Sequence, residues 1–491
     1  METRCHLGRP WRSALLLAWV LSGGLSRLVG VVVGVKEPSV EELRSTVPAE
    51  MRPNRAPVPD EDNAAVLFAS AVRGTSETTP EVRAALQTLA GWPATVPSDL
   101  EPMLPRIRSW LGENAEALNL WRSASRCRDC RFPPASVTNV ADGLRELGLL
   151  SLGLLCDAYL HWRDGDRAGS VDRLRDAANG GALFVQGAPS MLHYLVGSVQ
   201  RRKALETVGA AALRPTVTGS DLKLLAGILS SSPDESAQFR LCLRSELWDF
   251  IAPYSRLESV ARNYAGIHTN PAALALQPEE LRRPLQLVMD PKLLASHPRP
   301  LDAAKSFGNS LAFWTEVDRR VSQPWSPREL PDSSIEERER FVEEFAPIEE
   351  ALEGEELPLS DEAVERAAPL FRKMEDPVGR LLASLQNFSG VMYTRGYEAK
   401  TRNGAISAVV AVRRWADSHG GALPDSLQDL VRGDLLPRVP MDAFSGAPLL
   451  YSKREGKLWS VGPNTKDDGG QRDPVGEGAK DDLVWSVIPL P

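Results

Sequence analysis

The chain has 491 residues and a formal charge of −8 at neutral pH. Apolar residues make up 43% and charged residues 25%, which is the composition of a globular protein, and the length suggests roughly three domains. The acidic balance is spread over many residues, so we exclude a nucleic-acid-binding protein, which would present a basic face.

The first 35 residues predict a targeting segment. An apolar run at 14–21 follows three arginines and precedes small residues and a second apolar run at 28–35. This pattern fits a cleaved signal peptide and also an uncleaved signal anchor, because the two runs together are long enough to cross a bilayer. In both cases the positive-inside rule places the rest of the chain outside the cytoplasm. We therefore expect export across the bacterial inner membrane, to a membrane-anchored or periplasmic location.

A helical body is predicted after a Pro-rich linker at 36–62. From 63 to 330, apolar residues recur at helical spacing between Pro-rich loops. The Gly-Asp turn near 164–166 weakly resembles a tetratricopeptide hairpin, but no clean repeat follows, so we expect an irregular helical array. The longer helical runs are expected at 104–123, 140–162, 168–178, 191–213, 220–229, 236–252 and 301–321.

An acidic helical connector is predicted over 331–379. Phe341, Phe345 and Ile348 run beside its many glutamates at helical spacing, which indicates a solvated helix face rather than a metal-binding or partner-binding cluster. The last part of the chain, 380–491, is predicted to be a long helix to residue 418 followed by a short helix and a small antiparallel sheet. The fold class we expect is therefore mainly α, with an α+β C-terminal segment whose strands lie near 448–451, 458–461 and 481–487.

Motifs in a particular order mark this C-terminal segment. Gly420-Gly421-Ala422-Leu423-Pro424-Asp425-Ser426-Leu427 follows the long helix, and Pro440-Met441-Asp442-Ala443-Phe444-Ser445-Gly446 comes before the first strand. The order resembles the globular end of the major pseudopilins of type II secretion systems, with Ala443 at a usual Pro position. No prepilin cleavage site precedes the N-terminal apolar run, so we do not expect a pilus subunit. The chain is similar to uncharacterised exported bacterial proteins that carry such a tail on a helical body.

The resemblance implies a calcium site in the loop after the second strand. Calcium takes roughly six to eight oxygen ligands, and the glycines at 469 and 470 allow a tight turn that brings carbonyls inward. The alternative is a polar surface loop that holds no ion. The candidate ligands are Asp467, Asp468, Asp481 and Asp482.

Cys127 and Cys130 form the one C-x-x-C motif of the chain. The pair fits a redox site, half of a zinc site, or a local disulfide in an oxidising compartment. No second pair stands at zinc spacing and no thioredoxin-like pattern surrounds the motif. We therefore favour a structural disulfide or inert thiols.

No catalytic motif stands out, so we expect a non-enzymatic scaffold that binds a protein partner of unknown identity. We expect no nucleic-acid partner, and the inner membrane is a partner only if the anchor is uncleaved. One alternative is a secretion-system accessory protein that contacts pseudopilins. Another is an envelope hydrolase whose site is assembled from carboxylates that are distant in sequence, in which case paired acids with perturbed pKa values should line a deep pocket.

Overall fold

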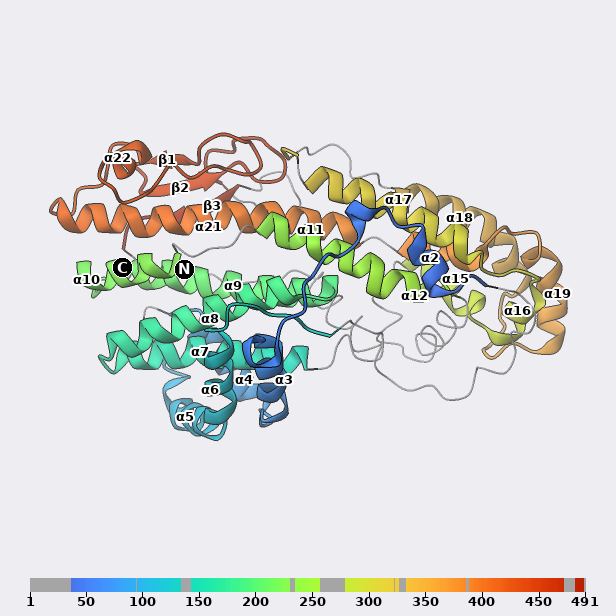
Figure 1. The fold of residues 1–491 in the computed structure, drawn as a ribbon, viewed down its shortest axis with the longest axis horizontal. Helices are drawn as coiled ribbons and strands as arrows, with labels where there is room; N and C mark the ends of the chain where they lie inside the picture. Colours follow the sequence, from blue (N-terminus) through green and yellow to red (C-terminus); the bar gives the residue numbers. More distant parts are fainter. Residues whose placement is uncertain are drawn as a thin grey trace.

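The computed structural model describes residues 37–93, 95–133, 143–229, 235–256, 279–321, 323–325, 333–385, 388–471 and 482–489. Over these residues the fold is mainly helical with one three-stranded antiparallel sheet, which confirms the predicted fold class. The predicted targeting segment lies outside the described residues. Among the helices that are described, none is long and apolar enough to cross a membrane. Figure 1 shows an elongated molecule in which the sheet lies at one end and a group of helices at the other.

Four short helices form one side of the body. The run predicted at 104–123 is two helices rather than one, because Asn114 interrupts it. The Asn114 side chain is fully buried; its Nδ2 donates to the Trp110 carbonyl at 2.8 Å, and its Oδ1 accepts from the Ser76 amide at 2.8 Å. The helices are α3 (Ala64–Arg73), α4 (Pro80–Ala90), α5 (Leu104–Glu113) and α6 (Ala115–Ala124).

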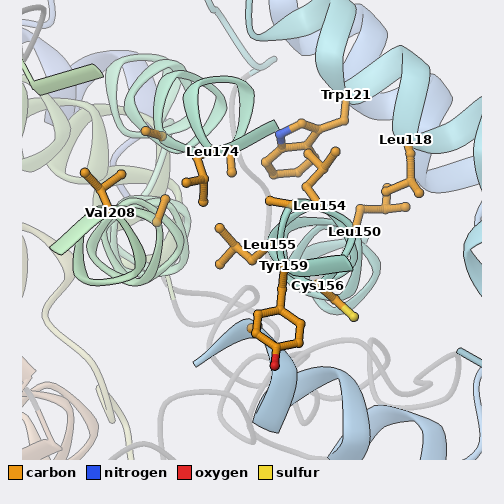
Figure 2. Close-up of a cluster of buried hydrophobic side chains, with 14 of the residues drawn as sticks. Leu118, Trp121, Leu150, Leu154, Leu155, Cys156, Tyr159, Leu174 and Val208 are labelled. Atoms are coloured by element: carbon orange, nitrogen blue, oxygen red, sulfur yellow. The ribbon is translucent and has the colours of Figure 1, made fainter. Parts of the chain in front are cut away.

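Three long helices form the centre of the body: α7 (Leu144–Arg163), α8 (Arg167–Gly187) and α9 (Met191–Ala212). The helix predicted at 168–178 extends nine residues further, to Gly187, and Gly181 in its second half lets α9 approach closely. A Cβ added at Gly181 would lie only 2.7 Å from the Arg201 backbone nitrogen. Figure 2 shows the apolar side chains that meet here, which include Trp121, Leu150, Leu154, Leu155, Leu174 and Val208.

The predicted linker at 36–62 is partly packed on the body. It contains α2 (Val40–Ser45), which begins at a capping box between Ser39 and Glu42. Leu43, Val47 and Met51 are buried in a second core. That core also takes side chains from α11 (Glu235–Ser245), the π-helical segment Glu246–Ile251 with α12 (Ala252–Tyr254), and α17 (Ala303–Val321).

A separate core forms the far end of the molecule, around Phe341, Phe345 and Ile348. These three side chains are buried while Glu343, next to them, is exposed, as a solvated helix face requires. Helices from the predicted body and helices from the predicted connector pack their side chains into this one core. They are α15 (Glu279–Val288), α16 (Pro291–Ser296), α18 (Ser333–Ala351), α19 (Asp361–Phe371) and α20 (Pro377–Leu385).

We call residues 388–489 the C-terminal module. Its sheet has the order β1-β2-β3, with Leu458 opposite Tyr451 on one side and Trp485 on the other. The strands fall where the sequence predicts them, and buried Leu458 packs with Val409 and Val412 of α21. The other side of α21 contacts α9 and α10 (Gly219–Leu229), which joins the module to the body (Figure 1). The elements are α21 (Phe388–Ser418), α22 (Leu427–Arg432), β1 (Leu450–Ser452), β2 (Lys457–Ser460) and β3 (Leu483–Ser486).

Candidate functional site

Asp442 holds the loops of the C-terminal module together. Its side chain is 1% exposed. Oδ1 accepts from the Ser460 hydroxyl at 2.8 Å and from the amide of Phe444 at 3.0 Å. Oδ2 accepts from the Val461 amide and the Ser445 hydroxyl, both at 3.1 Å. The carboxylate therefore connects the turn at 440–446 to the end of β2. The loop that begins there carries Asp467 and Asp468, and we call it the acidic loop.

Ala443 stands where the pseudopilin motif usually has a proline, and its backbone amide makes a hydrogen bond that a proline could not make. The Ala443 amide donates to the Thr401 hydroxyl of α21 at 3.0 Å, and Thr401 is fully buried. A proline has no amide hydrogen and cannot make this bond. The residue that departs from the pseudopilin pattern therefore ties the turn to the helix beneath it.

Asp482 lies at the start of β3 and organises the acidic loop. Its Oδ2 accepts from the amides of Asp468 at 3.1 Å and Gly470 at 2.8 Å. Both Gly469 and Gly470 have a positive φ, +72° and +69°, which lets successive amides turn toward one carboxylate oxygen. The side chain is fully buried, and its other oxygen, Oδ1, has no hydrogen-bond partner among the described residues. A buried acceptor without a partner is rare in folded proteins and calls for an explanation.

The other two described aspartates are nearby and more exposed. Asp467 Oδ1 accepts from the Trp459 indole at 3.0 Å and from the Gly469 amide at 2.9 Å. Asp468 Oδ2 accepts from the Asn464 side chain at 3.3 Å. Lys457 Nζ donates to the Gly469 carbonyl at 2.7 Å, so a cation already lies against this loop.

The electrostatics of the loop disfavour a charged Asp482 in the absence of a cation. Burial raises the pKa of Asp482, the two amides oppose this, and the charges of Asp468 and Asp467 raise it further. A divalent ion would favour the ionised carboxylate and reverse the effect. The unpartnered Oδ1 therefore fits a cation ligand, although Asp481, the fourth candidate, lies outside the described residues. Within the described parts of the chain, no group of three or more His, Cys, Asp or Glu side chains is placed to hold a metal.

Cys127 and Cys130 are free thiols in this structure. Cys130 is buried against Gly187 of α8, and burial raises the pKa of its thiol far above the ordinary value. The pKa of Cys127 is raised by burial and by the charge of Asp62. Neither thiol is activated as a nucleophile, because nucleophilic cysteines have lowered pKa values. The disulfide stays a prediction.

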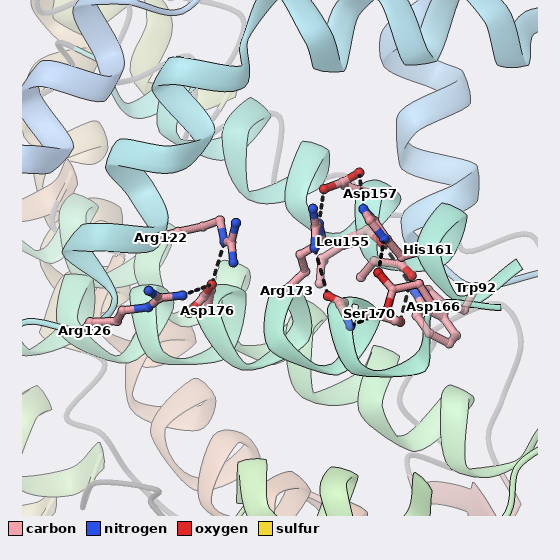
Figure 3. A network of polar contacts seen from close by, with 12 residues as sticks. Trp92, Arg122, Arg126, Leu155, Asp157, His161, Asp166, Ser170, Arg173 and Asp176 are labelled. Carbon is pink, nitrogen blue, oxygen red and sulfur yellow. Dashed lines mark hydrogen bonds and ion pairs between the residues drawn. The ribbon is translucent and has the colours of Figure 1, made fainter. Parts of the chain in front are cut away.

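A polar network in the body links helices α6, α7 and α8 (Figure 3). Arg122 of α6 and Arg126, two residues after the end of that helix, reach the buried Asp176 of α8, at 2.8 and 3.5 Å. Arg173 of α8 pairs with Asp157 of α7. Asp176 and Asp157 each have an arginine partner, so these carboxylates form ion pairs that join helices and are not poised as an acid or base. His161 belongs to the same network, because its Nδ1 lies 2.8 Å from Asp166.

A cavity of about 540 Å³ lies where the body meets the C-terminal module. Tyr397, Arg240 and Asp442 line it, and all three are engaged: the Tyr397 hydroxyl donates to the Gln323 carbonyl at 2.7 Å, and Arg240 pairs with Asp318 at 2.8 Å. A second cavity, between α4, α7 and α9, has no carboxylate among its lining residues. Neither cavity contains the paired acids that the hydrolase alternative requires.

No family model matches the sequence, no curated protein is significantly similar to it, and no solved structure matches its fold. The resemblance to pseudopilins therefore rests on the motifs of residues 420–485 alone.

Two features, one in the C-terminal module and one in the second cavity, could not be predicted from the sequence. Asp442 belongs to a motif that we singled out, yet its four hydrogen bonds depend on Ser460 and Val461 arriving from β2. The lining of the second cavity was missed altogether. Gln200, Arg83 and Lys203 line it, and they come from two helices more than a hundred residues apart.

Proposed function

We propose that this chain is a non-enzymatic, exported or membrane-anchored scaffold whose C-terminal module binds calcium and docks a protein partner. The observation that carries the proposal is the fully buried Oδ1 of Asp482, which lacks a partner among the described residues. Calcium favours carboxylate and carbonyl oxygens, and Asp468 with the turn at 469–470 supplies more of them next to Asp482.

Calcium binding would order the loop in two ways. It would compensate the negative charges of Asp467, Asp468 and Asp482, which repel one another. It would also compete with Lys457 for the Gly469 carbonyl, so the lysine would have to move as the ion enters. We therefore expect a single-site ion whose affinity depends on Asp482 most of all.

The edge of β3 supports a docking role. β3 pairs with β2 on one side, and no strand of the described residues pairs with its other side. Val484 of β3 and Ile488 just after it are 39% and 44% exposed. An open strand edge flanked by exposed apolar side chains can accept an extended partner segment.

The test is thermal unfolding of the protein with millimolar calcium and with chelator. We expect calcium to raise the transition of the C-terminal module by a few degrees, since a ligand that binds the folded state stabilises it. Asp482→Asn and Asp468→Ala should abolish the rise. Asp425→Ala, which removes an exposed carboxylate of the same module, should keep it. Absence of any shift in the wild-type protein would reject calcium binding.

A further inference from the structure

The second cavity lies between α4, α7 and α9 and has a volume of about 220 Å³. That is below the range of roughly 300–1,000 Å³ for drug-sized ligands, so its occupant is small. The walls are aliphatic, and none of the described residues that line the cavity is aromatic. Aliphatic walls suit a flexible alkyl chain better than a flat ring. Those walls are Leu149 and Leu152 of α7, and Leu192, Leu195 and Val196 of α9.

Gln200 is the unusual residue of this cavity. It is 4% exposed, and both its amide nitrogen and its amide oxygen lack a hydrogen-bond partner within the described residues. A buried amide with neither group satisfied is costly and rare in native proteins. Gln200 also lines the cavity, so rotation of its side chain would bring the buried amide to a ligand that carries both a donor and an acceptor. A secondary amide is the simplest such group.

Three cationic side chains belong to the lining of the same cavity. The Thr207 hydroxyl of α9 donates to the Ala90 carbonyl of α4 at 3.0 Å. Arg214, seven residues after Thr207, donates to the carbonyl of Trp92, two residues after Ala90, so the two segments run the same way here. Arg83, two helical turns before Ala90, and Gln200, two helical turns before Thr207, both line the cavity.

Arg145 of α7 and Lys203 of α9 add two more cations to the cavity wall. Burial lowers the pKa of Arg83, and the like charge of Arg145 lowers it further, while Glu146 offsets part of this. An anion placed between these side chains would relieve the repulsion.

We propose that this cavity binds a short-chain N-acyl amino acid. Its alkyl tail would lie between the leucines of α7 and α9, its amide would pair with Gln200, and its carboxylate would face Arg83, Arg145 and Lys203. The arrangement accounts for the aliphatic walls, the unsatisfied amide and the positive rim with a single ligand. This site is independent of the proposed calcium site in the C-terminal module.

Calorimetric titration of the full chain tests the proposal with three ligands. N-hexanoylglycine carries tail, amide and carboxylate; octanoate lacks the amide; octylamine has the opposite charge. We expect N-hexanoylglycine to bind at least tenfold more tightly than octanoate, and octylamine not to bind. Equal affinity for the two acids, or tighter binding of octanoate, would overturn the assignment of an acylated ligand.

Variants locate the site. Gln200→Leu should remove the preference for N-hexanoylglycine over octanoate, and Arg83→Gln should weaken both acids at least tenfold. Gly148→Leu should block binding, because Gly148 lines the cavity and a Cβ added there meets no atom within 4 Å. Gly112→Leu on α5 is the matched control, since its Cβ also meets nothing within 4 Å and Gly112 lies outside the cavity lining. Binding that survives Gly148→Leu unchanged would place the ligand elsewhere and contradict the proposal.

Discussion

The three-helix centre of the body and the C-terminal module are held together by different means. In α7–α9, apolar side chains fill the space and glycines set how closely the helices approach, as at Gly181 against Arg201. In the module, single buried carboxylates collect hydrogen bonds from loops that have few apolar residues of their own, as at Asp442. The body should therefore respond most to changes of volume, and the module to changes of charge and hydrogen bonding.

The largest effect should come from Asp442→Ala. It removes a fully buried carboxylate with four hydrogen bonds and leaves the amides of Phe444 and Val461 without an acceptor. We expect a loss of at least about 3 kcal/mol in the free energy of unfolding of the module. Denaturant unfolding followed by tryptophan fluorescence measures it. Asp425→Ala, which removes a carboxylate that is 88% exposed, is the control and should change little.

Gly181→Ala, which adds volume inside the body, should have the next largest effect on stability. Gly181→Ala places a Cβ 2.7 Å from the Arg201 backbone nitrogen, so α8 and α9 must separate. We expect a loss of about 2 kcal/mol by chemical denaturation. The same substitution at Gly112, where a Cβ meets nothing, should instead add about 0.4–1 kcal/mol. If both substitutions act alike, close packing at Gly181 does not limit stability.

Asp376 tests whether a buried carboxylate is costly outside the module. It is 5% exposed, and burial raises its pKa from 3.8 to about 6, although the amides of Asp302 and Gly379 oppose the shift. Because the folded pKa is the higher one, the contribution of this group is largest below pH 3.8 and is lost as the pH rises through 6. The loss amounts to roughly 3 kcal/mol. Asp376→Asn should flatten the pH dependence of the free energy of unfolding between pH 4 and 6. If the slope is unchanged in this variant, the pH dependence belongs to other groups.

The smallest effect concerns Thr401 and Ala443. Thr401→Val removes the acceptor of the Ala443 amide and should cost about 1 kcal/mol. Ala443→Pro removes the donor, so the cost of Thr401→Val should shrink when both are changed. Additive losses in a double-mutant cycle would show that the bond contributes nothing.

The fold class was predictable because helical periodicity and strand alternation are local signals. The spacing of Phe341, Phe345 and Ile348 indicated a helix with one buried face, and the alternation of apolar and polar residues around Leu458 indicated a strand. The break at Asn114 was not predictable, because it depends on the Ser76 amide from another segment. The extension of α8 past residue 178 was missed for a similar reason, since Gly180 and Gly181 look like helix breakers until Trp121 of α6 packs on the first and Arg201 of α9 on the second.

The candidate site was predictable only in part. The resemblance singled out Asp482, but its buried, unpartnered oxygen follows from how β3 meets the turn at 469–470. The cavity beside Gln200 has no sequence signal, because one polar residue on an otherwise apolar helix face occurs in many proteins. The cavity becomes a candidate site only with Arg83, which tertiary packing brings into the same lining.

Hydrogen exchange of the full chain, with and without calcium, tests the central claim most directly. We predict that calcium slows the exchange of the amides of Asp468 and Gly470, which donate to Asp482, and leaves α7–α9 unchanged. Asp482→Asn should abolish that protection. If calcium does not change the exchange of these amides, the module does not bind calcium, and the acidic loop is only a structural feature of the sheet.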